Sequence, residues 1–325
     1  MSNLSHTPLE SLADAESVIE IKSYDEMRAR ILFREGFDAK IVKPAKIIGW
    51  YKLEPRIACG KSDCHQEHGL GYLVVRSDGL EGNIGNQCGE KHFGTDFKIL
   101  RNQFESKKRV KSYRDRLSNA KSSLPEIWRR LAHLKKQDFG AAWVHDTSET
   151  FRLGCPPELF SRIRGMAQRG ETKIFSERRL SDAEKNVRNA MGAGRSDDQD
   201  EDDEDDTKNK KSSGPQFVRE LIGNLEGLDI WQIDVREILI EKIERRAQEF
   251  DQLNIFGLSE PKLLVWVRWY ESLEGEFSAA QSLIDAAQRF FAKDNIKLAM
   301  QMQLSEITSR KLRQLTWDSA KSRWK

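Results

Sequence analysis

One stretch of the sequence decides how the chain folds: CGKSDCHQEHGLGYLVVRSDGLEGNIGNQCGEKH, from Cys59 to His92. It contains three of the four cysteines and three of the six histidines of the 325-residue chain. Four cysteines are too few for the disulfide framework of a secreted protein of this length. Thiolate and imidazole groups in mixed sets are typical ligands of structural zinc sites. The stretch therefore predicts that the chain binds Zn²⁺.

A β-hairpin and a helix are predicted inside and after this stretch. Residues Tyr72 to Arg76 favour a strand, Ser77-Asp78-Gly79 is a turn signal, and Gly82 to Gly85 returns the chain as a second strand. Cys88 and His92 are four residues apart, so they share one face of the helix that follows. We expect the hairpin to bring two pairs of ligands together.

This order of features resembles a treble-clef zinc finger, in which a two-cysteine knuckle, a β-hairpin and a helix supply four ligands. The resemblance covers about residues 55–105 and identifies no family for the whole chain. By this resemblance, Cys59 and Cys64 take the knuckle role, and Cys88 and His92 take the helix role. Treble-clef knuckles usually place two residues between their cysteines, whereas four lie between Cys59 and Cys64. His68, four residues after Cys64, is therefore an alternative ligand.

Catalytic uses of such a metal are less well supported by the sequence. The tripeptide His65-Gln66-Glu67 matches half of the zinc-deaminase motif, but the P-C-x-x-C half is absent. Nucleases of the HNH type need a histidine on the hairpin, and none lies between Gly69 and Gln87. The chain also lacks phosphate-binding and hydrolase signatures. Because four protein ligands leave no open coordination position, we expect a structural zinc ion in a non-enzymatic protein.

The segment after the cluster is strongly basic. Between Lys91 and Lys136, fourteen Lys and Arg residues stand against four Asp and Glu residues. A basic helix that leaves a zinc finger is suited to contact phosphates, with an affinity that falls steeply as salt rises. A solvated helix face is the alternative interpretation. Phe93, Phe97 and Phe104 have the spacing of a helix core and are expected to pack rather than stack on bases. The predicted nucleic-acid contacts are Lys98, Arg101, Lys107, Lys108, Arg109, Lys111 and Arg114.

An acidic block offsets this basic segment. Nine of the ten residues from Asp197 to Asp206 are acidic, so the formal net charge of +2 is the sum of opposite blocks. Residues 192–215 contain no large apolar side chain and are predicted to form a disordered linker. We also hypothesise that the acidic block competes with nucleic acid for the basic helices.

The fold class predicted from the whole sequence is mostly α, with a small α+β zinc-finger module and two domains. The C-terminal domain is expected to be a helical bundle. The predicted segments are residues 1–54 with helices and strands that lead into the finger, 55–105 as the finger, 106–191 as a basic helical region, 192–215 as the acidic linker, and 216–325 as the bundle.

Several local features give finer predictions. Ser23 and Glu26 have the spacing of a capping box, and Pro125 is suited to open a helix. Phe151 to Cys155 is interpreted as a strand, with Cys155 as a small core residue. The segment from residue 217 to residue 324 reads as all-helical, and Trp266, Trp269 and Tyr270 at helical spacing are expected to lie in its core.

Two functions are compatible with these features. The first is a zinc-binding, non-enzymatic protein that contacts nucleic acid through the basic helices after the finger. The second is an adaptor or inhibitor, of the kind carried by phages or mobile elements, that binds a protein partner through its C-terminal helical domain. No apolar run is long enough to span a membrane and the N-terminus has no signal-peptide pattern, so we expect a soluble, cytoplasmic protein without membrane contact.

Overall fold

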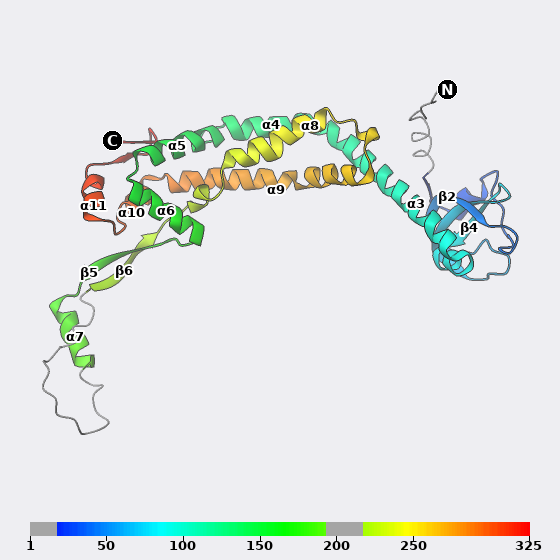
Figure 1. Cartoon of the computed structure of the whole chain (residues 1–325), viewed down its shortest axis with the longest axis horizontal. Helices are drawn as coiled ribbons and strands as arrows, with labels where there is room; N and C mark the ends of the chain where they lie inside the picture. The colour runs from blue at the N-terminus through cyan, green and yellow to red at the C-terminus, as the bar shows by residue number, and fades with distance from the viewer. Residues whose placement is uncertain (1–17, 193–216) are drawn as a thin grey trace, which may run out of the picture. The chain divides into compact units, whose positions relative to one another are not determined.

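The structure is a computed structural model, and it describes residues 18–192 and 217–325. The start of the first predicted segment and most of the predicted linker, including the acidic block, lie outside these residues. The described chain is mostly α-helical with one small four-stranded sheet, which confirms the coarse fold class (Figure 1). Within the described ranges, no helix is both long enough and apolar enough to cross a lipid bilayer.

The four-stranded sheet forms near the N-terminus. Its strands are β1 (Ile19–Ile21), β2 (Pro44–Ala58), β3 (Glu67–Arg76) and β4 (Glu81–Gly85), in that order across the sheet. β1 is parallel to β2, and the other neighbours are antiparallel, with Tyr72 opposite Ile84 in the β3–β4 hairpin. This confirms the predicted hairpin. The N-cap half of the predicted capping box is present, because Ser23 Oγ accepts from Glu26 N at 3.1 Å where α2 (Tyr24–Arg28) begins, while the Glu26 carboxylate accepts from Lys22 N at 2.8 Å.

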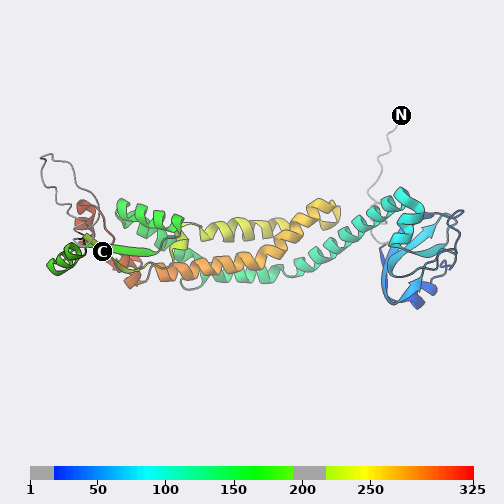
Figure 2. The same cartoon turned by 90° about the horizontal axis from the view of Figure 1, so that it is seen from below.

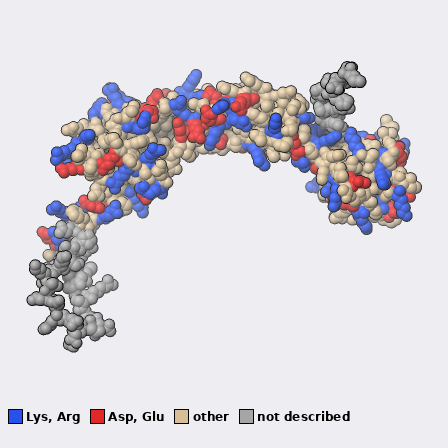
Figure 3. Space-filling view, viewed as in Figure 1, with Lys and Arg blue, Asp and Glu red and all other residues tan. Residues whose placement is uncertain are grey.

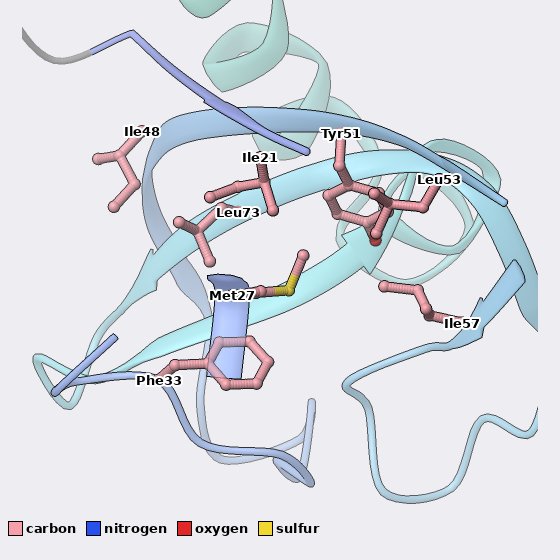
Figure 4. Packing of buried hydrophobic residues seen from close by; sticks show 8 residues of the cluster. All are labelled: Ile21, Met27, Phe33, Ile48, Tyr51, Leu53, Ile57 and Leu73. Atoms are coloured by element: carbon pink, nitrogen blue, oxygen red, sulfur yellow. The ribbon is translucent and has the colours of Figure 1, made fainter. Parts of the chain in front are cut away.

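Both faces of this sheet are buried. Alternate residues of a strand point to opposite faces, so Leu73 packs into one core and Val74 into the other. Figure 4 shows the first core, where Met27 from α2 and Tyr51 from β2 lie among aliphatic side chains. Helix α3 (Asn86–Ser122) covers the opposite face through Phe97 and Phe104, which are buried as predicted.

Helix α3 begins directly after β4 and is the longest helix that the structure describes. Gly94 interrupts its helical backbone with φ 54° and ψ −126°. The predicted boundary between residues 105 and 106 lies inside this helix. Ser123 separates α3 from α4 (Leu124–Lys136), which contains Pro125 in its first turn, as predicted.

The remaining elements are α5 (Ala141–Gly154), α6 (Pro157–Arg169), β5 (Lys173–Arg179), α7 (Asp182–Gly192), β6 (Phe217–Asn224), the short 3-10 helix η3 (Leu228–Trp231), the π-helix η4 (Glu237–Glu244), α8 (Arg245–Asp251), the 3-10 helix η5 (Ile255–Gly257), α9 (Glu260–Phe290), α10 (Lys293–Ala299), α11 (Glu306–Leu312), β7 (Trp317–Asp318) and β8 (Arg323–Trp324).

Two predictions about this half of the chain are wrong. The segment from Phe151 to Cys155 is the last turn of α5 and its C-cap rather than a strand, because a short apolar run before two prolines fits a buried helix end equally well. The segment after residue 216 is not all-helical, because β6 pairs antiparallel with β5 and β7 pairs with β8. Cys155 is buried, as predicted.

The chain divides into two compact units. The first contains the described residues up to Ser123 together with Phe250–Glu271, and the second contains Leu124–Glu249 and Ser272–Lys325. These units are not bounded by the predicted linker. Compact units and independently folding domains are different things, so the predicted domain division stays a prediction.

Aromatic side chains form much of the core in each unit. In the first unit, Phe250 contacts Trp266 and Trp269 with ring centroids 5.6 and 5.3 Å away, and these tryptophans are buried as predicted. Tyr270, predicted to lie in the same core, is half-buried. In the second, Phe151 of α5 contacts Phe290 near the end of α9 at 5.5 Å. α5 and the C-terminal half of α9 lie side by side in both views (Figures 1 and 2).

Candidate metal centre

Three cysteines from three parts of the first unit meet at one place. Cys59 follows β2, Cys64 lies in the loop before β3, and Cys88 lies in the first turn of α3. Their sulfur atoms all lie within 4.8 Å of one another, and the sulfurs of Cys64 and Cys88 are 3.6 Å apart. All three are free thiols. Cys59 and Cys88 are 7% and 4% exposed, while Cys64 is half-buried. This cluster can hold a metal ion.

The loop that carries Cys59 and Cys64 is tied to the sheet through Asn83 of β4. The Asn83 side-chain amide donates to the carbonyl of Ala58 at 2.8 Å, and the backbone carbonyl of Asn83 accepts from Gly60 N at 3.0 Å. A Cβ atom on Gly60 would lie 2.5 Å from the Asn83 carbonyl oxygen, so only glycine fits this close approach. The hairpin therefore positions the loop directly beside the start of α3.

Backbone hydrogen bonds reach two of the three sulfurs. Burial raises the pKa of Cys59, and hydrogen bonds from the backbone of Lys61 and Gly85 oppose that rise. Burial also raises the pKa of Cys64, but hydrogen bonds from the backbone of Gln66 and from the neighbouring thiols outweigh it, so the pKa is lowered. The sulfurs of Cys59 and Cys64 thus each accept a hydrogen bond from the backbone N–H of the residue two positions later. Such donors orient and stabilise thiolates around a bound cation.

Cys88 is the most strongly perturbed thiol of the cluster. Burial, followed by the charge of Cys59, raises its pKa to about 12. Its sulfur also lies 3.5 Å from Oε1 of Gln66, a residue that the spacing of cysteines and histidines does not identify. Since thiolates are the form that binds metals, a cation at this site would replace the thiol protons.

The predicted ligand His92 lies one helical turn beyond Cys88, but its ring is not part of the sulfur group. Its Nδ1 is 3.2 Å from Nζ of Lys61, which is buried and forms an ion pair with Asp63 at 2.7 Å. Burial and the charge of Lys61 lower the pKa of His92. The structure therefore brings three of the four predicted ligands together, and the four-ligand set stays a prediction.

The alternative ligand, His68, has a different environment. Its Nδ1 is 3.1 Å from the hydroxyl of Tyr51, and the two rings are stacked with centroids 5.9 Å apart. Its Nε2 is buried without a hydrogen-bond partner. His68 and Cys88 both border a cleft of about 530 Å³ whose other lining residues include Arg56 and Gln66. His68 is thus near the cluster but outside the group of sulfurs.

The basic residues predicted to contact nucleic acid mostly have partners within the first unit. Three of them pair with carboxylates: Arg109 contacts Glu260 at 2.5 Å, while Lys98 and Arg101 both contact Glu90. Others have neutral partners. Lys108 Nζ lies 3.5 Å from the centroid of the Trp50 ring, Lys111 donates to the carbonyl of Val18 at 3.3 Å, and Arg114 donates to the carbonyl of Phe256 at 2.8 Å. Lys107 is half-buried and also interacts with another group of the protein.

Neighbouring basic residues of α3 follow the same pattern. Arg116 pairs with Glu271, and Lys121 donates to the carbonyls of Asp251 and Leu253, both at 2.9 Å. Several basic side chains of α3 therefore contact residues 250–271 of the same unit. The positive charges with neutral partners remain uncompensated at these contacts.

Comparisons of the chain with protein-family models, with curated proteins and with solved structures found no match.

Proposed function

We propose that this chain is a zinc-binding, non-enzymatic protein that binds nucleic acid. The observation that carries the zinc part is the cluster of Cys59, Cys64 and Cys88. Three thiolates form a soft ligand set that suits Zn²⁺, and His92 on the next turn of α3 is the fourth ligand that we propose. With four protein ligands, the site is structural and resembles that of a treble-clef finger. The ion would hold the loop after β2 against the first turn of α3.

The nucleic-acid part is supported by the basic residues of α3 that have neutral partners. Contact with the Trp50 ring leaves the charge of Lys108 intact, and a backbone carbonyl does the same for Lys111. Arg109, in contrast, is compensated by Glu260. We therefore assign the phosphate contacts to Lys108 and Lys111 and an internal role to Arg109. Binding through such contacts weakens as salt displaces the protein from the phosphates.

Metal analysis of the purified protein tests the zinc part. We expect about one zinc ion per chain, since one four-ligand cluster holds one ion. Cys88→Ser should reduce the zinc content substantially. Cys155→Ser is the matched control, because Cys155 is also buried but lies in the second unit. A folded protein without metal, or equal zinc contents in both variants, would contradict the proposed site.

A binding titration at several salt concentrations tests the nucleic-acid part. The double variant Lys108→Gln, Lys111→Gln should bind a labelled DNA duplex more weakly. The slope of log binding constant against log salt concentration (the salt slope) should be smaller in magnitude by about 2, since each lost phosphate contact lowers it by roughly 0.9. Arg129→Gln is the control, because Arg129 pairs with Glu126 and lies in the second unit. Absence of binding at low salt would contradict this part and favour an adaptor that acts through its C-terminal helices.

A further inference from the structure

Strands β5 and β6 form a two-stranded ribbon, and one face of this ribbon groups exposed apolar and basic side chains. The cross-strand pairs Phe175–Leu221, Glu177–Arg219 and Arg179–Phe217 follow one another at steps of two residues, so all six side chains lie on the same face. Phe175, Phe217 and Leu221 are 38%, 46% and 48% exposed. Large apolar side chains grouped on a surface in this way indicate a binding site rather than a solvated strand.

Each exposed phenylalanine on this face is accompanied by an arginine. The guanidinium of Arg179 lies 5.9 Å from the ring centroid of Phe217, and that of Arg219 lies 5.5 Å from the ring centroid of Phe175. Glu177 is the acidic residue of this face, and it lies 3.7 Å from Arg219. The face therefore alternates flat rings with cations and keeps a net positive charge.

The opposite face of the ribbon lacks this character. Arg178 pairs there with Glu184 of α7 at 2.7 Å and with Glu220 of β6 at 3.2 Å. Two carboxylates thus compensate one guanidinium. The contrast between the faces gives an internal control for any experiment on the ribbon.

A basic cleft continues from the aromatic face. It has a volume of about 470 Å³, and Phe175 and Arg219 line it together with Arg162, Arg169 and Lys173, while Glu171 is its acidic lining residue. Blue side chains are visible on this part of the surface, over α6 and the ribbon (Figure 3). The base of the ribbon is fixed, because Ile174 is buried and Gly223 packs closely against Leu298 of α10. The end of the ribbon that borders the cleft is therefore anchored to the rest of the second unit.

We propose that this face and cleft bind single-stranded nucleic acid. Bases stack on the rings of Phe175 and Phe217, while the phosphates run past Arg219 and Lys173 into the cleft. Exposed rings stack on bases only when the bases are not paired inside a duplex, and neighbouring cations serve the backbone. An acidic peptide would use the cations but would leave the two rings without a partner. This site goes beyond the proposed function, because all its residues belong to the second unit and require neither zinc nor α3.

The test measures fluorescence anisotropy of a labelled oligothymidine strand and of its duplex with oligodeoxyadenosine, using the full chain. We expect the single strand to bind more tightly than the duplex. Phe175→Ala and Phe217→Ala should each weaken single-strand binding about tenfold without changing the salt slope. The double variant Lys173→Gln, Arg219→Gln should weaken it and lower the slope by about 1.4, since each contact to a single strand contributes roughly 0.7. Arg178→Gln should have no effect.

Further variants separate the possible outcomes. Phe217→Leu keeps an apolar side chain but removes the flat ring, so it should also weaken binding while leaving the thermal unfolding midpoint unchanged. Wild-type affinity for the single strand in both Phe175→Ala and Phe217→Ala would overturn the proposal. Polyglutamate is also tested as a competitor of the labelled strand. If it competes, and only substitutions of the basic residues weaken binding, the proposal is overturned in favour of an acidic peptide. Loss of single-strand binding only in the Lys108 and Lys111 variant would overturn this site while leaving the proposed function intact.

Discussion

Single residues set the packing of this chain where the backbone approaches another segment closely. Gly227, just before η3, has φ +68°, a left-handed conformation that side chains with a Cβ adopt at a cost. A Cβ atom at this position would lie 2.0 Å from the carbonyl oxygen of Ala286 in α9. Glycine is therefore required there for two reasons, one torsional and one steric.

Gly227→Ala should lower the free energy of unfolding by about 2–4 kcal/mol, because left-handed strain and overpacking against α9 add together. Gly79→Ala is the matched control, since Gly79 has φ +82° but no atom within 4 Å of the added Cβ. It should cost only about 1–2 kcal/mol. Urea titrations of both variants compare the two values, and equal losses would contradict the steric part of the argument.

At the metal centre, the sequence identifies the chemical groups but not their surroundings. The spacing of Cys59, Cys64 and Cys88 around a hairpin is a local signal, and the structure brings these three thiols together. Asn83 and Lys61 also shape the site, yet an asparagine in a strand and a lysine in a loop carry no pattern that distinguishes them. The position of the His92 ring depends on its contact with Lys61, a residue 31 positions earlier. Such contacts follow from the folded structure only.

At the scale of elements, α3 shows how a local charge count can mislead. The balance of +10 between Lys91 and Lys136 is correct, but the carboxylates that compensate Arg109 and Arg116 lie 151 and 155 residues away. Figure 3 shows basic and acidic side chains intermixed over the helical part of the surface. Several basic side chains of the helix contact residues 250–271, so fewer of its positive charges are available to phosphates.

Glu260→Gln tests this internal role of α3. Hydrogen bonds from Arg109 and then Ser106 lower the pKa of Glu260 below its ordinary value of 4.5. The carboxylate therefore stabilises the fold above the unfolded-state pKa, and this contribution is lost as the pH falls through the lower folded-state pKa. The variant should be less stable than wild type at pH 7 by about 1 kcal/mol or less, because the pair is partly exposed.

The difference between wild type and Glu260→Gln should shrink as the pH falls below about 4. Denaturant titrations from pH 7 to pH 3 measure it. The control is Glu306→Gln, because Glu306 forms an exposed i, i+4 pair with Arg310 within a single helix. A stability difference that does not depend on pH would contradict the role assigned to the Glu260 carboxylate.

The elements that the sequence predicts are those with local signals. The N-cap at Ser23, the turn at Ser77-Asp78-Gly79 and the restart at Pro125 each depend on neighbouring residues alone. The β5–β6 ribbon depends on partners that the chain separates by about forty residues, such as Ser176 and Glu220. Four of the seven residues of β5 are charged, and the apolar residues of β6 are adjacent to one another, as Phe217-Val218 and Leu221-Ile222. Neither strand therefore shows the apolar alternation that predicts a half-buried strand.

At the scale of the whole molecule, the two candidate sites belong to different units. The cysteine cluster and the sheet lie in the first unit, and the β5–β6 ribbon with its cleft lies in the second. The apparent binding free energy of a structural zinc ion, about 10–16 kcal/mol, is comparable to the stability of a whole domain, about 5–15 kcal/mol. A bound ion should therefore dominate the stability of the segment that it crosslinks and leave the other unit largely unaffected.

Removal of the metal from the full chain should thus affect one unit selectively. After treatment with a zinc chelator, amide hydrogen exchange should accelerate in β2 to β4 and in the first turns of α3, because the loop after β2 is no longer fixed to Cys88. Exchange in α5, α6 and residues 272–290 should stay unchanged. Readdition of zinc should restore the slow exchange, whereas magnesium, which prefers oxygen ligands, should not. Equal acceleration in both units, or none in the sheet, would contradict a zinc site that stabilises the first unit locally.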